Sequence, residues 1–105
     1  MDIYKLKKTN EFREVFLKGN KKLGKYVILY VLPVNQDNNR VGIITKKNIG
    51  NAVKRNKIKR ILREIWRNKC NKLISGCDVV ILARKNISNA RFSEIEAELI
   101  KLIDL

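Results

Sequence analysis

Residues 50–63 read GNAVKRNKIKRILR and combine a dense run of cations with apolar residues at helical spacing. Apolar positions recur at i, i+3, i+4 and i+7, which predicts a helix from about residue 52 to residue 72 with one buried stripe. The stripe consists of Ile58, Ile61, Leu62, Ile65 and Trp66. At about 100° per residue, a polar set falls opposite the stripe: Asn56, Arg60, Arg63 and Arg67. Lys59 lies on one flank of this polar arc and Lys57 on the other.

The charge of the chain is concentrated in and around this helix. Glu64 is the only acid between residues 46 and 72, and the cations there are Lys46, Lys47, Lys54, Arg55, Lys57, Lys59, Arg60, Arg63, Arg67, Lys69 and Lys72. An ordinary solvated helix alternates Glu with Lys to gain i,i+4 pairs. A merely solvated face therefore accounts poorly for this run, whereas a face that binds phosphates explains it.

The composition restricts the class of protein. A chain of 105 residues with 45% hydrophobic content suits one domain, residues 1–105, with a single core. A formal charge of +14 indicates a polyanionic partner, nucleic acid first and an anionic membrane surface second. No apolar stretch approaches the roughly 20 residues that span a bilayer, and the N-terminus lacks a signal-peptide core. We therefore expect no membrane partner and a cytoplasmic location.

The residues that usually carry chemistry are scarce. The chain has no histidine, and its two cysteines, Cys70 and Cys77, are too few for a zinc site. We expect both to be reduced structural thiols. No nucleophile motif and no close pair of carboxylates points to an acid–base site. The sequence therefore predicts neither a catalytic residue nor a metal ligand in the polypeptide.

The N-terminal half predicts one helix and a hairpin. Thr9 and Asn10 are good N-cap types, and Phe12, Val15 and Phe16 follow at helical spacing before Gly19. Residues 26–34 and 40–45 are rich in β-branched residues, with aromatics in the first segment, and flank a turn cluster at 36–39, which predicts a β-hairpin. The basic residues 19–25 suit a short edge strand.

The C-terminal half predicts a strand and a last helix. Residues 78–83, DVVILA, are almost continuously apolar and suit the interior of a sheet. Ser93 and Glu96 form a capping-box pattern ahead of the apolar positions of a helix that reaches the C-terminus. The fold class is therefore α+β in the order α-β-β-(β)-α-β-α, with helices packed on a small mixed sheet.

Five residues admit two interpretations each. Phe12, Phe16 and Tyr30 suit either core packing or a stacking platform for unpaired bases, which is indifferent to base sequence. Asn51 and Asn56 each suit either an N-cap or a polar contact to phosphate or sugar, and for Asn51 both roles are compatible.

Residues 47–60, KNIGNAVKRNKIKR, together with Gly42 and Arg63, resemble the signature of the bacterial ribonuclease P protein subunit. The context of the resemblance extends along most of the chain: the Phe12-x-x-x-Phe16 helix, the strand with Tyr30 and the strand at 78–84 agree with it. Three positions depart from the family pattern. Asn48 replaces a lysine, Lys46 stands at a serine position, and Lys57 stands where arginine is common, which keeps charge but loses a bidentate fork.

The resemblance implies a small basic protein that binds a catalytic RNA subunit and precursor tRNA, with no further protein partner required. The particle removes the 5′ leader of precursor tRNA, with Mg²⁺ bound mainly by the RNA, so the chain alone should be inactive. The resemblance implies as RNA-binding residues Lys47, Asn51, Arg55, Asn56, Lys59, Arg60 and Arg63. The cationic face of the helix adds Lys57 and Arg67 to this set. The resemblance also assigns Phe12, Phe16 and Tyr30 to a leader-binding cleft, and implies a left-handed β-α-β crossover where general rules favour the right hand.

Two rival functions are open. A general or ribosomal-type RNA-binding protein would bind RNA without distinguishing a leader. A protein-only nuclease would cleave RNA by itself and would need an essential carboxylate.

Overall fold

The computed structural model describes residues 4–104, which build a five-stranded mixed sheet. The strands are β1 (Tyr4–Lys5), β2 (Asn20–Leu23), β3 (Val27–Pro33), β4 (Arg40–Ile44) and β5 (Cys77–Ala83). Their order across the sheet is β1-β4-β5-β3-β2. The pairs β1–β4 and β4–β5 are parallel, and β5–β3 and β3–β2 are antiparallel.

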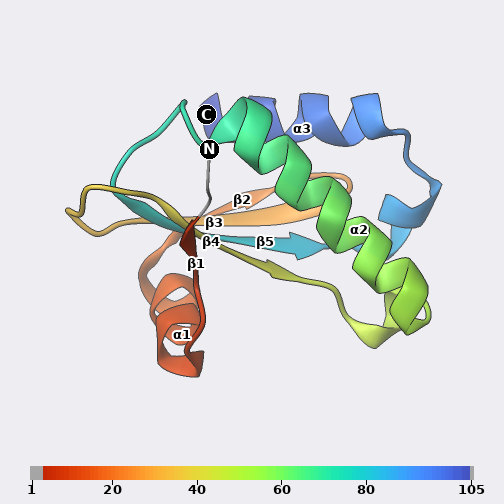
Figure 1. The fold of residues 1–105 in the computed structure, drawn as a ribbon, viewed down its shortest axis with the longest axis horizontal. Coiled ribbons are helices and arrows are strands. Elements are labelled where there is room, and N and C mark those ends of the chain that lie inside the picture. The colour runs from red at the N-terminus through yellow and green to blue at the C-terminus, as the bar shows by residue number, and fades with distance from the viewer. Residues whose placement is uncertain (1–3, 105) are drawn as a thin grey trace.

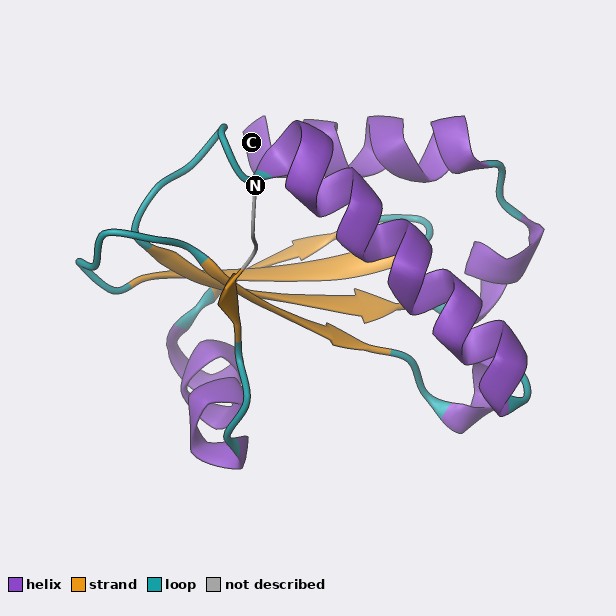
Figure 2. Cartoon of the chain, in the orientation of Figure 1, coloured by secondary structure: helices purple, strands orange, loops and turns teal. Residues whose placement is uncertain are grey.

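Helices lie on both faces of this sheet (Figure 1). Three α-helices are present in the described chain: α1 (Thr9–Lys18), α2 (Ala52–Ile65) and α3 (Phe92–Asp104). Shorter turns are η1 (Lys47–Ile49), η2 (Trp66–Cys70, a π-helix that continues α2) and η3 (Lys85–Asn89). Figure 2 shows α2 and α3 over one face and α1 below the other. The predicted α+β class and element order are confirmed, with β2 as the basic edge strand and β1 as an unpredicted addition.

The predicted hairpin between residues 26–34 and 40–45 is wrong, because β3 and β4 are not neighbours. Strand β5 lies between them, antiparallel to β3 and parallel to β4. Six of the seven residues of β5 are buried, so this strand gains most from a place with a partner on each side. The interior position predicted for 78–83 is confirmed. Because this strand pairs with both β3 and β4, those two strands do not pair with each other as a hairpin.

The segment from β4 through α2 to β5 joins two parallel neighbouring strands. It is therefore a β-α-β unit with α2 as the connection. The left hand of the crossover stays a prediction from the resemblance.

Two predicted helix starts need correction. Helix α1 starts at Thr9 with Lys8 as N-cap, and the Glu11 carboxylate accepts the Lys8 and Lys7 N–H groups at 2.8 and 3.0 Å. Thr9 and Asn10 therefore lie inside the first turn. Helix α3 starts at Phe92, where Glu94 accepts the Arg91 N–H at 2.9 Å. In both helices a glutamate reaches back to an N–H that precedes the helix.

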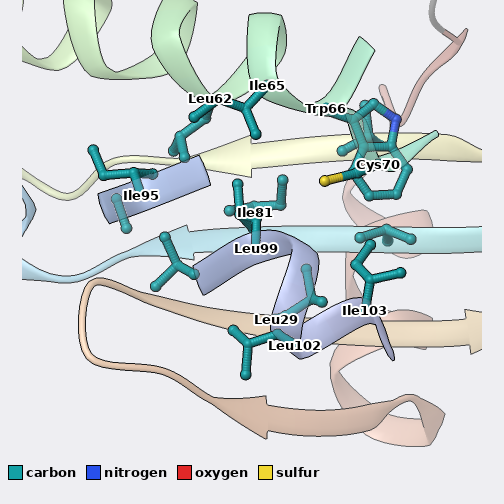
Figure 3. Close-up of a cluster of buried hydrophobic side chains, with 14 of the residues drawn as sticks. Leu29, Leu62, Ile65, Trp66, Cys70, Ile81, Ile95, Leu99, Leu102 and Ile103 are labelled. Atoms are coloured by element: carbon teal, nitrogen blue, oxygen red, sulfur yellow. The ribbon is translucent and has the colours of Figure 1, made fainter. Parts of the chain in front are cut away.

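The main core lies between the sheet and helices α2 and α3 (Figure 3). Leu62 and Ile65 of α2 and Trp66 of η2 are each 1% exposed or less. They pack in one core with Leu29 and Ile81 of the sheet. The core assignment of Trp66 and the predicted apolar stripe are confirmed, although Ile61 is only half-buried.

The opposite face of the sheet is covered less completely. Here α1 packs against β3 and β5, around a small cluster of Leu6, Val15 and Val80. Strand β3 shows the asymmetry, since Val27, Leu29 and Val31 are buried and the residues between them are half-buried. The α1 face therefore keeps apolar and aromatic surface accessible.

Candidate nucleic-acid interface

The start of α2 is set by local geometry around Asn51. The Asn51 Oδ1 accepts the Lys54 N–H at 2.9 Å, so its N-cap interpretation is confirmed. Gly50 before it has φ +154°, a backbone conformation that L side chains rarely adopt. The turn η1 leads into Gly50, with Ile49 buried and Lys47 exposed. The cap leaves the Asn51 residue exposed at the edge of the basic helix.

The predicted basic residues divide by exposure along α2 and η2. The exposed residues are Asn51, Asn56, Lys57, Arg60 and Arg67, whereas Arg55, Lys59 and Arg63 are half-buried. Exposed Arg60 and Arg67 therefore point to solvent, away from the core stripe. Half-buried Lys59 and Arg63 lean toward the edge of the sheet.

The basic segment is not neutralised from within the protein. Among residues 4–104, no cation between positions 46 and 72 forms an ion pair with a carboxylate. The Arg55 Nε is also buried without a hydrogen-bond partner in this part of the chain. The ion pairs that are present lie elsewhere: Lys18 with Glu14 within α1, and Arg40 with Glu11 and Asp78. The charge of α2 is thus available to an external anion.

A pocket of about 130 Å³ lies beside α2, at the side of the sheet that β1 and β4 form. It joins cations from two elements with one aromatic ring, and its lining consists of Lys5, Leu6, Phe12, Val41, Gly42, Ile43, Lys59 and Arg63. Lys59, Arg63 and Phe12 were predicted to bind RNA or leader, and the fold brings these three together. We call this lining the edge pocket.

Phe16 and Tyr30 form a second aromatic group, on the face of the sheet that α1 covers. Their ring centroids are 4.8 Å apart and the rings are inclined at 81°, an edge-to-face contact. Phe16 is 38% exposed and Tyr30 is half-buried beside the small α1 core. Phe12 packs against the same core but also lines the edge pocket. The rings therefore combine packing with accessible faces, so core and stacking interpretations both keep support.

Gly42 makes room for one of these rings. A Cβ at this position would overlap the Phe12 ring and approach Leu6 to 3.3 Å. The absence of a side chain at Gly42 thus lets the Phe12 ring approach the backbone of β4 at the edge pocket.

An ionic network fixes α1 beside this face. Arg40 donates from Nε and Nη2 to the two oxygens of buried Asp78 at 2.8 and 2.7 Å, and from Nη1 to Glu11. The Asp78 carboxylate raises the pKa of Arg40 above its ordinary value, chiefly through these hydrogen bonds. The network joins the starts of α1, β4 and β5, and so it holds helix α1, which carries Phe12, against the sheet.

Glu11 makes the stability that this ionic network contributes to the fold depend on pH. Hydrogen bonds from the Lys8 and Lys7 N–H groups, helped by Arg40, lower the pKa of Glu11 from 4.5 to about 2. A depressed folded-state pKa stabilises the fold above pH 4.5, and this contribution disappears as the pH falls toward 2.

We expect Glu11→Gln to lower the Tm at pH 6 and to match the native chain near pH 2. Thermal melts by circular dichroism across this range, with Glu14→Gln of the same helix as control, measure the difference. A Tm difference that persists undiminished at pH 2 would contradict the assignment.

Sequence reasoning missed Lys5 and Leu6 of the edge pocket. Strand β1 has only two residues, and its parallel pairing with β4 is a contact of distant segments. The one available signal was the basic run at residues 5, 7 and 8.

The part of the chain that the structure describes contains no candidate metal centre. Among residues 4–104, no three side chains of the His, Cys, Asp or Glu type converge. Burial raises the pKa of the Cys70 thiol to about 11 and raises that of Cys77 above its ordinary value. The described helices include none that is long and apolar enough to cross a bilayer.

The family model described as Ribonuclease P matches residues 2–104 of the chain. The chain is 37% identical to the ribonuclease P protein component of Alkaliphilus metalliredigens, over 94% of this chain and 89% of that protein. It is 35% identical to the component of the same name from Clostridioides difficile, over 93% and 87%.

Solved structures agree with the family match. The RNase P protein of Staphylococcus aureus superposes with a TM-score of 0.87 at 29% identity, covering 98% of this chain and 94% of that one. The RNase P protein of Thermotoga maritima gives 0.86 at 28% identity, covering 96% of each chain.

Proposed function

Because this chain belongs to the ribonuclease P protein component family, we propose that it binds the catalytic RNA subunit and the 5′ leader of precursor tRNA. It assists the Mg²⁺-dependent endonucleolytic removal of that leader, which leaves the mature 5′ end of the tRNA. The catalytic groups belong to the RNA, and the particle works in the cytoplasm.

One observation carries the proposal: the edge pocket joins Phe12 to Lys59 and Arg63. An aromatic face with two cations beside it suits an unpaired nucleotide, whose base stacks while its phosphates meet the charges. A double-stranded RNA offers no free base face for such a contact. The pocket and the neighbouring Phe16–Tyr30 pair therefore favour the single-stranded leader.

The outward cations of α2 take the other role. Exposed Arg60 and Arg67, with Asn56, form a face that lies away from the core and lacks acidic partners in the described chain. Phosphate contacts of this kind position a partner without reading its bases. We assign this face to the folded catalytic RNA, so that one helix holds the RNA and presents the leader pocket at its flank.

The Mg²⁺ ions of the reaction belong on the RNA in this proposal. Two carboxylates near α1, Glu11 and Asp78, are both paired with Arg40, so they do not fit a site for a hard cation that needs free oxygen ligands. The protein's cations screen phosphate repulsion instead, which should lower the Mg²⁺ concentration that the particle needs.

Reconstitution tests the proposal directly. We expect cleavage of precursor tRNA at low Mg²⁺ only when the chain is mixed with a bacterial ribonuclease P RNA, and not with either component alone. Gel analysis of 5′-labelled precursor gives the cut position and rate. Cleavage by the chain alone would instead support a protein-only nuclease, and a mixture without rescue would support a general RNA-binding protein.

Phe16 should affect the leader more than the fold. Because its ring is 38% exposed, we expect Phe16→Leu to weaken binding of precursor tRNA by on the order of tenfold relative to mature tRNA. Affinity measured on the reconstituted particle with both tRNAs gives this ratio, and Phe16→Tyr should retain it. A large fall in Tm with an unchanged ratio would assign Phe16 to the core.

A further inference from the structure

A second groove lies between the first turns of α2, the turn η3 and the start of α3. Its volume is about 160 Å³. The apolar lining comes from Ile58, Ile61, Ile87, Ala90, Phe92 and Ile95, and Lys54 and Lys57 of α2 supply its cations. In Figure 1 the start of α2 and the segment before α3 lie together at one end of the molecule. We call this site the α2–α3 groove.

Exposure shows which parts of the groove a ligand meets. Ile58, Ile87 and Ile95 are buried, with 2 to 6% of their surface accessible, whereas Phe92 is 43% exposed. Lys54 and Lys57 are exposed as well. A ligand would therefore meet an aromatic ring and two ammonium groups over an apolar base.

The polar surroundings select the charge of that ligand. None of the groove's lining residues is acidic. The carboxylate of Glu94, next to Ile95, accepts the Arg91 N–H at 2.9 Å and the Tyr26 hydroxyl at 3.1 Å, so it is engaged on another side. The Ser88 hydroxyl donates to the Lys85 carbonyl at 3.2 Å, which leaves its oxygen as an acceptor in the lining. The groove thus combines positive charge, an aromatic face and one hydrogen-bond acceptor.

From these features we infer that the α2–α3 groove is a second nucleotide site. It takes one unpaired base of the catalytic RNA against Phe92 and the flanking phosphates on Lys54 and Lys57. Its volume is below the range of pockets that enclose drug-sized ligands. A groove of this size suits one base ring better than the several side chains that a bound peptide helix would insert. The groove lies on the Lys57 flank of α2 and the edge pocket on the Lys59 flank, so a single RNA can occupy both.

The inference rests on the proposed RNA binding, and the test separates the two. Affinity for a bacterial ribonuclease P RNA is measured by filter binding over a salt series, for the native chain and four variants. Phe92→Leu should bind about tenfold more weakly with an unchanged salt slope, because stacking is lost and no phosphate contact is. Lys57→Gln should weaken binding and reduce the slope by about one. Phe92→Tyr should bind as the native chain does.

Leu73→Ala is the matched control, since Leu73 is exposed to the same 43% as Phe92 and lies outside the groove. Circular dichroism melts check that the variants fold, and Phe92→Tyr keeps the ring if Phe92→Leu lowers the Tm. If Phe92→Leu binds the RNA with native-like affinity, the inference about the groove is overturned and the proposed function is not. If the native chain does not bind the RNA, the proposed function itself is overturned. Self-association of the native chain that Phe92→Leu abolishes would assign the groove to a second copy, and would also overturn the inference.

Discussion

Replacing Arg60 and Arg67 together by Gln should weaken binding of a bacterial ribonuclease P RNA by on the order of 50-fold at about 0.1 M salt. Each lost phosphate contact removes one released counterion, so the slope of log affinity against log salt should become shallower by about 1.5 to 2. The structure supports a large effect because neither arginine has an ion-pair partner within residues 4–104. Filter binding between 50 and 400 mM salt gives both quantities.

The matched control removes the same charge elsewhere. Lys18→Gln with Lys101→Gln also lowers the formal charge from +14 to +12, but on α1 and α3, where both lysines are exposed. If the two double variants lose affinity equally, net charge rather than a docking face governs binding. An unchanged affinity and slope in the arginine variant would remove both residues from the interface.

Asp78→Asn should lower the stability of the fold by about 2 kcal/mol, or about 10 °C in Tm. The Asp78 side chain is 5% exposed and accepts three hydrogen bonds, two from Arg40 and one from Gln36. An amide nitrogen in place of one oxygen would face a guanidinium donor and leave the Arg40 charge without its main partner. Arg40 is 33% exposed, so water compensates part of the loss, and the value is below that of a fully buried pair.

The same variant should disturb leader binding more than RNA docking. The network that Asp78 anchors positions α1 and Phe12, whereas α2 packs on the opposite face of the sheet. Thermal melts give the stability, and the affinity ratio of precursor to mature tRNA gives the leader effect. The control is Asp37→Asn, which changes an exposed carboxylate of the β3–β4 loop. An unchanged Tm for Asp78→Asn would show that the network contributes little to the fold.

Local pattern explains what could be predicted. The basic face, the apolar stripe and the Asn51 cap of α2 depend on residues within a turn or two of one another, so helical periodicity alone reveals them. The interior place of β5 follows from its own continuous apolar run. Helix starts were less accurate, because Glu11 and Glu94 cap from inside the helix while Thr, Asn and Ser suggested nearby N-caps.

Strand pairing could not be predicted in the same way. Turn residues at 36–39 favour a hairpin, but the short loop between β3 and β4 spans the start of β5 instead. That choice depends on how much apolar surface three separate segments bury together, which no one segment encodes. The edge pocket has the same origin, since β1, α1, β4 and α2 each contribute part of its lining.

The sequence by itself determined that the chain is one basic α+β domain with a long helix that carries a concentrated run of cations. It also determined the family resemblance, because the signature lies in one continuous segment. Only the tertiary structure decided that Lys59 and Arg63 line one pocket with Phe12, that Arg40 joins α1 to β5, and that Phe92 lines a second groove with Lys54 and Lys57. The physical reason is that helical faces repeat over a few residues, whereas pockets form where burial of apolar surface brings distant segments together.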